Sequence, residues 1–155
     1  MSCASATQRS TFERTAPTVG LTLATSRHDI ARAILEGLTF ELLVNLDALE
    51  RCGIRVAELV AVGGGAKSSL WLQLKADILG RPMRTLQCRE AACLGAALLA
   101  GAATGIYASL EEAVQATVKS DRMFTPREPV VSRYRERFDL YQQLHPALRA
   151  VKPAL

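Results

Sequence analysis

Three consecutive glycines, Gly63, Gly64 and Gly65, separate a short apolar run from a stretch with helical periodicity. Each glycine loses extra backbone entropy on folding, so three in a row weaken a strand and a helix alike. They permit a tight turn in which a ligand can lie against bare backbone. A helix after such a turn directs its unpaired N–H groups, and the positive end of its dipole, into the same space. The sequence therefore predicts a strand, a ligand-binding turn and a helix, an arrangement suited to a nucleotide.

The rest of the chain alternates between helical and strand-like hydrophobic spacing. Ser26 followed by Asp29, and Ser109 followed by Glu112, are typical of capping boxes that begin helices. The predicted helices span residues 27–52, 68–79, 89–103, 109–119 and 131–144, and the predicted strands span residues 59–62 and 83–86. This order predicts an α/β fold whose two strands are parallel and joined by a right-handed crossover.

Three further expectations concern the later part of the chain. Residues 120–130, which contain two prolines, are interpreted as a polar loop. The His145–Pro146 step is expected to end or kink the last helix. The helix over 89–103 has so few large side chains that a second backbone is expected to approach it closely.

Two commoner glycine motifs fit this turn poorly. A P-loop requires a glycine directly before its lysine, where this sequence has Ala66. The dinucleotide fingerprint finds Gly63 and Gly65, but Ser68 replaces its third glycine and Gln87 replaces the acidic residue that closes the next strand. The P-loop is therefore excluded, and a partial nicotinamide-binding domain stays as an alternative.

Several motifs follow one another in a fixed order around the turn. Residues 29–37 read Asp-Ile-Ala-Arg-Ala-Ile-Leu-Glu-Gly, residues 63–68 read Gly-Gly-Gly-Ala-Lys-Ser, residues 76–82 read Ala-Asp-Ile-Leu-Gly-Arg-Pro, and residues 90–101 read Glu-Ala-Ala-Cys-Leu-Gly-Ala-Ala-Leu-Leu-Ala-Gly. Together with Trp71, this series resembles the FGGY carbohydrate kinases, most closely their xylulose-kinase-like members. The resemblance covers about residues 20–144.

The resemblance implies a ribonuclease-H-like ATPase domain of the actin and hexokinase type. The chain would hold its C-terminal half, with an incomplete sheet and several helices. Residues 20–150 would form a truncated FGGY C-terminal, nucleotide-binding domain, and residues 1–19 an unmatched, disordered segment. The implied adenosine site consists of Gly63, Gly64, Gly65, Ala66, Lys67 and Ser68.

The resemblance also implies a reaction, the transfer of the ATP γ-phosphate to a hydroxyl of a xylulose-like sugar. In this family an Asp acts as the base, and it lies with the first phosphate loop in the N-terminal half. We therefore expect no catalytic residue and no metal ligand in this chain, with the Mg²⁺ ligands in the missing half. The chain alone is expected to be inactive and to meet the sugar only through that half.

Three explanations fit this interpretation: a truncated gene, a split kinase with a separate N-terminal chain, or a partial gene model. A separate N-terminal half or a second copy is the expected partner. A non-catalytic nucleotide-binding or interaction module stays open as a second function. With strands missing, Ile34, Leu38 and Leu59 are expected to be incompletely covered, which would leave the chain marginally stable and prone to associate.

Composition argues against several other classes. Apolar residues make up 49% of the chain, charged residues 22%, and the net charge of +4 comes without a basic run, so no nucleic-acid partner is expected. The four cysteines form no CxxC pair, which favours a reducing cytoplasm over a zinc site. The apolar run over 91–103 is too short to cross a membrane. Glu36, Glu90, His28 and His145 are interpreted as structural or surface residues.

Overall fold

The computed structural model describes residues 18–88 and 90–149 of the chain. In chain order the elements are α1 (Arg27–Arg51), β1 (Leu59–Ala61), the 3₁₀ helix η1 (Gly64–Lys67), α2 (Ser69–Leu79), β2 (Met83–Leu86), α3 (Ala91–Ala103), α4 (Leu110–Thr117), β3 (Ser120–Phe124) and α5 (Glu128–Arg149). The α/β class and every predicted helix and strand are therefore confirmed. The expectation for residues 1–19 falls almost entirely outside the described residues.

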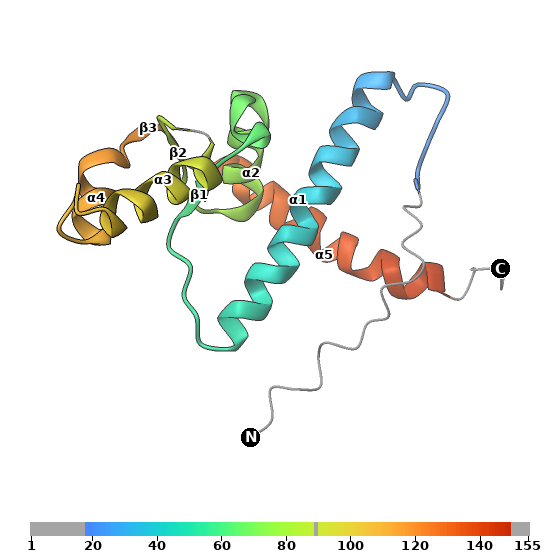
Figure 1. The fold of residues 1–155 in the computed structure, drawn as a ribbon. Coiled ribbons are helices and arrows are strands. Elements are labelled where there is room, and N and C mark those ends of the chain that lie inside the picture. The colour runs from blue at the N-terminus through green and yellow to red at the C-terminus, as the bar shows by residue number, and fades with distance from the viewer. Residues whose placement is uncertain (1–17, 89, 150–155) are drawn as a thin grey trace.

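The three strands form one mixed sheet in the order β1-β2-β3. β1 and β2 are parallel, with Leu59 opposite Met83, and α2 connects them as the sequence predicted. β2 and β3 are antiparallel, with Met83 opposite Phe124. Figure 1 shows the sheet gathered with α3 and α4 on one side of α2, while α1 and α5 cross on the other.

The third strand corrects the polar loop predicted over residues 120–130. Ser120–Phe124 is largely polar and exposed, so its composition gives little sign of a strand. Its position depends on β2 instead. The register between them shifts near Arg84, and there the backbone N–H of Arg122 donates to the buried Thr85 hydroxyl at 3.1 Å.

The beginning of α1 follows its sequence signal closely. The Ser26 hydroxyl accepts from the Asp29 backbone N–H at 3.3 Å, and the Asp29 carboxylate accepts from the Ser26 backbone N–H at 2.9 Å. These reciprocal bonds satisfy two N–H groups that helix geometry leaves without partners. The capping box predicted at Ser26 is thus confirmed.

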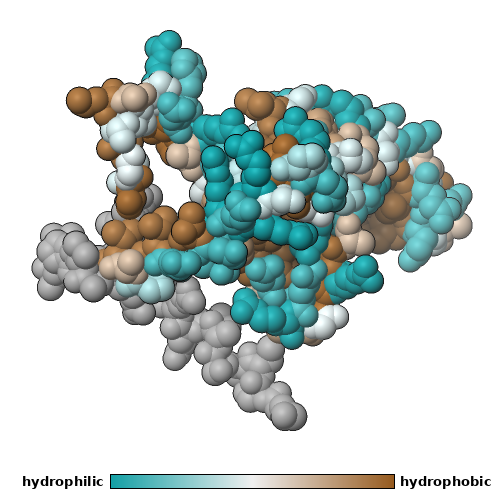
Figure 2. All heavy atoms as spheres, turned by 180° about the vertical axis from the view of Figure 1, so that it is seen from behind, coloured by the Kyte–Doolittle hydropathy of each residue, from teal (hydrophilic) through white to brown (hydrophobic). Residues whose placement is uncertain are grey.

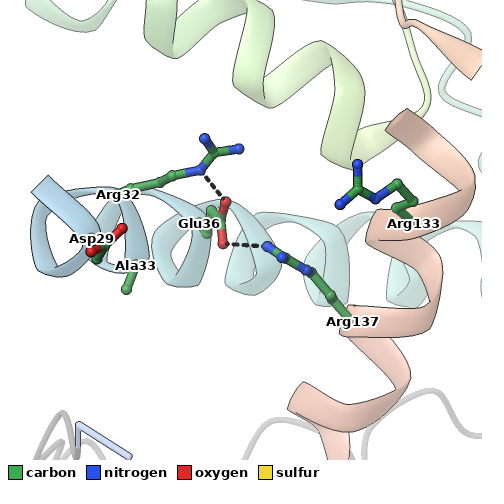
Figure 3. A pocket seen from close by; sticks show the side chains of 6 residues that line it. All are labelled: Asp29, Arg32, Ala33, Glu36, Arg133 and Arg137. Carbon is green, nitrogen blue, oxygen red and sulfur yellow. Dashed lines mark hydrogen bonds and ion pairs between the residues drawn. The ribbon is translucent and has the colours of Figure 1, made fainter. Parts of the chain in front are cut away.

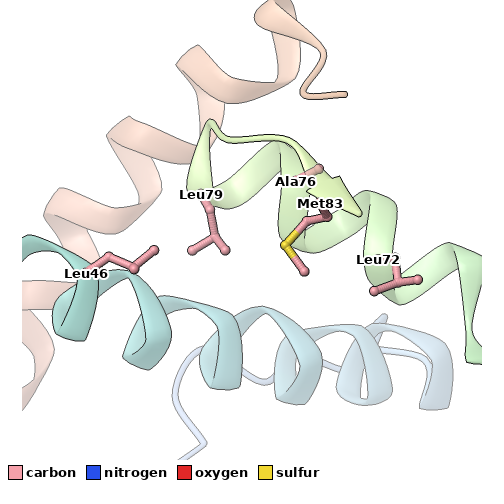
Figure 4. Packing of buried hydrophobic residues seen from close by; sticks show 5 residues of the cluster. All are labelled: Leu46, Leu72, Ala76, Leu79 and Met83. Carbon is pink, nitrogen blue, oxygen red and sulfur yellow. The ribbon is translucent and has the colours of Figure 1, made fainter. Parts of the chain in front are cut away.

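The main hydrophobic cluster lies between α1, α2 and one face of the sheet (Figure 4). Its buried members are Leu46, Leu72, Ala76, Leu79 and Met83. Leu59 and Ala61 of β1 pack against it from the sheet. Because α2 supplies three of these side chains, its position relative to the sheet is fixed by packing.

A second cluster joins α1 and α2 to α5. Phe40, Ile78, Tyr134 and Phe138 are all buried there. The Phe40 ring lies 5.7 Å from the ring of Phe138 and 5.1 Å from the ring of Tyr141, measured between centroids. The aromatic stripe of the last helix is therefore a packing face, as predicted.

The last helix differs from its predicted bounds at both ends. α5 begins at Glu128 instead of Val131, because proline is tolerated in the first turn of a helix, where Pro129 lies. It also includes Pro146 and continues to Arg149, so the prediction that the His145–Pro146 step ends the helix is wrong.

The backbone of α4 lies close to that of the small-residue helix α3, as expected. At Gly101 the nearest neighbour is a side chain, because a Cβ built there would lie 3.0 Å from two ring atoms of Tyr107. At Gly95, on the same helix, no heavy atom lies within 4 Å of such a Cβ.

Several large apolar side chains lie at the surface, and Figure 2 shows hydrophobic patches on the face opposite that of Figure 1. Ile34 is 58% and Leu38 55% exposed, which confirms that α1 is incompletely covered there. Leu59 is only partly exposed, because it packs against the main cluster.

Candidate functional site

The glycine triplet lies between β1 and α2, where the sequence predicted the site. Gly63 has φ 70° and ψ −158°, a conformation that side-chain-bearing residues rarely adopt. Its carbonyl accepts from the Ala66 backbone N–H at 3.1 Å, which closes the short 3₁₀ helix η1 before α2 begins. Residues 63–68 therefore form a defined loop, which backbone hydrogen bonding stabilises.

One side of this loop is bare. A Cβ built on Gly63 or Gly64 would meet no heavy atom within 4 Å. A Cβ on Gly65 would lie 3.6 Å from the Trp71 ring, and Ala66 is completely buried. The loop is therefore anchored at its second half and open at its first, where backbone can contact a ligand.

The first turn of α2 faces the same region. The Ser68 hydroxyl accepts from the Trp71 backbone N–H at 3.3 Å, so it caps the helix as predicted. By helix geometry the N–H groups of Ser69 and Leu70 have no acceptor within the helix. No acidic residue lies in the first turn, so nothing there offsets the positive end of the helix dipole.

Two basic residues border this helix end. Lys67 is exposed and makes no hydrogen bond or ion pair with any residue that the structure describes. Arg122 of β3 donates from Nη1 to the Ser69 hydroxyl at 2.7 Å. No sequence pattern indicates Arg122, because the strand that carries it is largely polar.

The Trp71 ring lies next to Gly65 of the loop, and its motif predicted no role for it. Its indole N–H is buried and has no acceptor among the described residues. Lys75, one helical turn further, places its ammonium group 4.0 Å from the centre of the ring. Burial lowers the pKa of Lys75.

The acidic and histidine side chains considered in the sequence lie elsewhere. Glu36 accepts hydrogen bonds from Arg32 at 2.8 Å and from the Tyr134 hydroxyl at 2.7 Å, so it joins α1 to α5. Glu90 is the N-cap of α3 and makes no side-chain capping bond, and His28 is exposed in the first turn of α1. The side chain of His145 lies outside the described part of the structure.

The described residues contain neither a metal-binding cluster nor a membrane-spanning helix. Within residues 18–88 and 90–149, no three His, Cys, Asp or Glu side chains are grouped so that they could hold a metal ion. No helix in that part is long and apolar enough to cross a membrane.

Residues 3–104 match the model of the FGGY family of carbohydrate kinases, C-terminal domain. The chain belongs to this family. It is 34% identical to the xylulose kinase of Bacillus subtilis over 88% of its length, and 41% identical to the L-fuculokinase of Escherichia coli over 70%. These matches cover 28% and 23% of the two relatives, so the chain spans about a quarter of their length.

Solved structures of FGGY relatives share the fold. The ligand-bound xylulose kinase from Lactobacillus acidophilus matches 85% of this chain with a TM-score of 0.74 and 31% identity, over 27% of its own length. The Plasmodium falciparum glycerol kinase with ADP matches 88% of this chain with a TM-score of 0.68 and 27% identity, over 26% of its own length. The fold of an FGGY C-terminal domain is therefore established for this chain, and the glycine loop lies within the matched region.

Proposed function

We propose that this chain is the nucleotide-binding part of an ATP-dependent carbohydrate kinase and that residues 63–68 receive the adenosine and its nearest phosphate. The observation that carries the proposal is the bare first half of the loop at Gly63 and Gly64, directly before the first turn of α2, where the N–H groups of Ser69 and Leu70 have no acceptor within the helix. A nucleotide could lie against this backbone without displacing any side chain. The ADP named with the Plasmodium falciparum glycerol kinase supports an adenine nucleotide as the ligand.

The chemistry of the whole kinase would be the transfer of the ATP γ-phosphate to a sugar hydroxyl. Such transfer depends mainly on positioning and on charge stabilisation. In this proposal residues 20–150 form the domain that positions the adenosine end of ATP. The base, the Mg²⁺ ligands and the sugar contacts belong to the rest of the kinase. A xylulose-like sugar is the proposed substrate, because xylulose kinases are among the similar relatives.

Calorimetry with ADP tests the loop through Gly64→Val. Gly64 does not have a positive φ, and its Cβ would meet nothing in the protein, so valine fits the fold while it fills the proposed ligand space. We expect at least tenfold weaker binding. Gly37→Val on α1 is the matched control, because a Cβ there also meets nothing within 4 Å. Equal ADP affinity in the wild type and both variants would contradict the assignment.

A further inference from the structure

A second polar site lies on the face where α1 crosses α5, apart from the glycine loop. A hollow of about 490 Å³ opens there, lined by Asp29, Arg32, Ala33, Glu36, Arg133 and Arg137. Figure 3 shows that α1 and α5 both contribute charged side chains to it. A smaller hollow of about 70 Å³ adjoins these residues and shares the three arginines.

The charges around the hollow are unevenly paired. Glu36 is 13% exposed and accepts from Arg32 at 2.8 Å, whereas its contact with Arg137 is longer, at 3.4 Å. The Asp29 carboxylate is occupied by the capping bonds to Ser26. Two carboxylates therefore face three guanidinium groups, which leaves the hollow with a net positive charge.

Arg133 is the unpaired member of this group. Within residues 18–88 and 90–149 it makes no hydrogen bond and no ion pair, and Figure 3 shows its guanidinium extended from α5 beside the hollow. It lies one helical turn before Arg137, and like charges at this spacing destabilise a helix slightly. A ligand with negative charge would relieve this repulsion.

We propose that this hollow is a binding site for a small phosphate-bearing anion, held by Arg133 and Arg137 of α5 with Arg32 of α1. A single guanidinium fork satisfies one carboxylate, whereas several forks from two helices suit a phosphoryl group, which has three oxygens and up to two charges. Glu36 stays bonded to Arg32 and Tyr134 and sets the positions of the arginines. The weaker contact of Arg137 with Glu36 leaves that guanidinium able to turn to the ligand.

Calorimetry with inorganic pyrophosphate at low salt tests the site through Arg133→Gln. Arg135→Gln is the matched control, because Arg135 is also an exposed arginine of α5 and does not line the hollow. We expect pyrophosphate to bind the wild type and Arg135→Gln alike, and Arg133→Gln at least tenfold more weakly. Arg133 is exposed and makes no hydrogen bond or ion pair with the described residues, so its replacement should leave the fold intact, which circular dichroism checks.

Two further measurements show at which site pyrophosphate binds. Pyrophosphate binding should persist in Gly64→Val, since that change alters only the glycine loop. Binding lost in Gly64→Val and kept in Arg133→Gln would place the anion at the loop and overturn the proposal. Equal affinities of the two arginine variants, no binding by the wild type, or equally tight binding of acetate would also overturn it. Failure of ADP binding with pyrophosphate binding intact would contradict only the proposed function.

Discussion

Asp77 and Arg127 tie α2 to the beginning of α5. Nη2 of Arg127 lies 2.6 Å from Oδ2 of Asp77, and the backbone N–H of Arg127 donates to Oδ1 at 2.9 Å. Asp77 is only 1% exposed, and Gln73 adds a further donor, to Oδ1 at 3.0 Å. A buried carboxylate requires such partners, because its desolvation is costly. The pair therefore fixes where the chain leaves the sheet and starts the last helix.

Replacing Asp77 should weaken the fold. Asp77→Ala removes the acceptor for Arg127 and Gln73, and we expect the free energy of unfolding to fall by about 1.5–3 kcal/mol, the range for hydrogen bonds to a charged group. Urea denaturation measures it. Asp139→Ala is the control, because Asp139 is an exposed residue of α5, and it should change stability by no more than about 0.5 kcal/mol. Equal losses in the two variants would contradict the role of Asp77.

The same pair makes a prediction about pH. Burial by itself raises the pKa of Asp77, but the hydrogen bonds from Arg127 and Gln73 outweigh it and hold the pKa below its ordinary value of 3.8. A carboxyl with a lowered folded pKa stabilises the fold above its unfolded pKa, and this contribution is lost as the pH falls through the folded pKa. We expect the Asp77 contribution to be complete at neutral pH and to fade below about pH 4.

Asp77→Asn isolates this effect in urea denaturation at a series of pH values. Other carboxyl groups titrate in both proteins, so the difference in unfolding free energy between the wild type and the variant belongs to Asp77. That difference should shrink steadily below pH 4. A constant difference down to pH 2 would show that the Asp77 pKa is not coupled to folding.

The glycine loop and its two flanking elements were predictable because their signals are local. Ser68 caps α2, and Gly80 ends it with a left-handed backbone of φ 61°, so each boundary depends on one residue. β3 was not predictable in this way. Its residues are mostly charged or polar, and only its pairing with β2 makes it a strand. Arg122 at the site was missed for the same reason.

Two other features depended on tertiary packing. Periodicity predicted α1, but by itself it does not distinguish Leu46, which is buried, from Leu38, which is exposed. The expectation that Leu38 is incompletely covered came from the family resemblance and its missing strands. The Asp77–Arg127 pair joins residues far apart in the sequence, so no spacing rule could indicate it. In both cases the missing information was which element packs against the helix.

Two glycines of α3 should respond oppositely to substitution. At Gly95 an added Cβ meets nothing, so Gly95→Ala should raise stability by about 0.5–1 kcal/mol through its lower backbone entropy cost. At Gly101 the Cβ would already lie 3.0 Å from the Tyr107 ring, so Gly101→Val should lower stability. Thermal denaturation of the two variants checks the pair. A more stable Gly101→Val would show that Tyr107 does not lie against α3.

The isolated chain should show no sugar kinase activity. The proposed nucleotide loop supplies positioning, and no residue of the chain is assigned as the base. ATP consumption with xylulose, glycerol or other sugars should stay at background. Turnover with any of them would mean that catalytic residues of this chain have been overlooked. Activity that returns when a sugar-binding kinase half is added would separate a kinase part from a non-catalytic nucleotide-binding module.

The last prediction concerns the exposed apolar residues Ile34 and Leu38 of α1. Ile34 and Leu38 are more than half exposed, so replacing both with Gln should change unfolding free energy by no more than about 1 kcal/mol. Binding of a hydrophobic dye and self-association in sizing chromatography should both decrease, because large exposed apolar patches promote contacts. Leu46→Ala provides the contrast, since Leu46 is 3% exposed and its truncation should cost about 2–5 kcal/mol. If the double variant were destabilised as much as Leu46→Ala, the first half of α1 would be covered in solution. That result would contradict the exposure of Ile34 and Leu38.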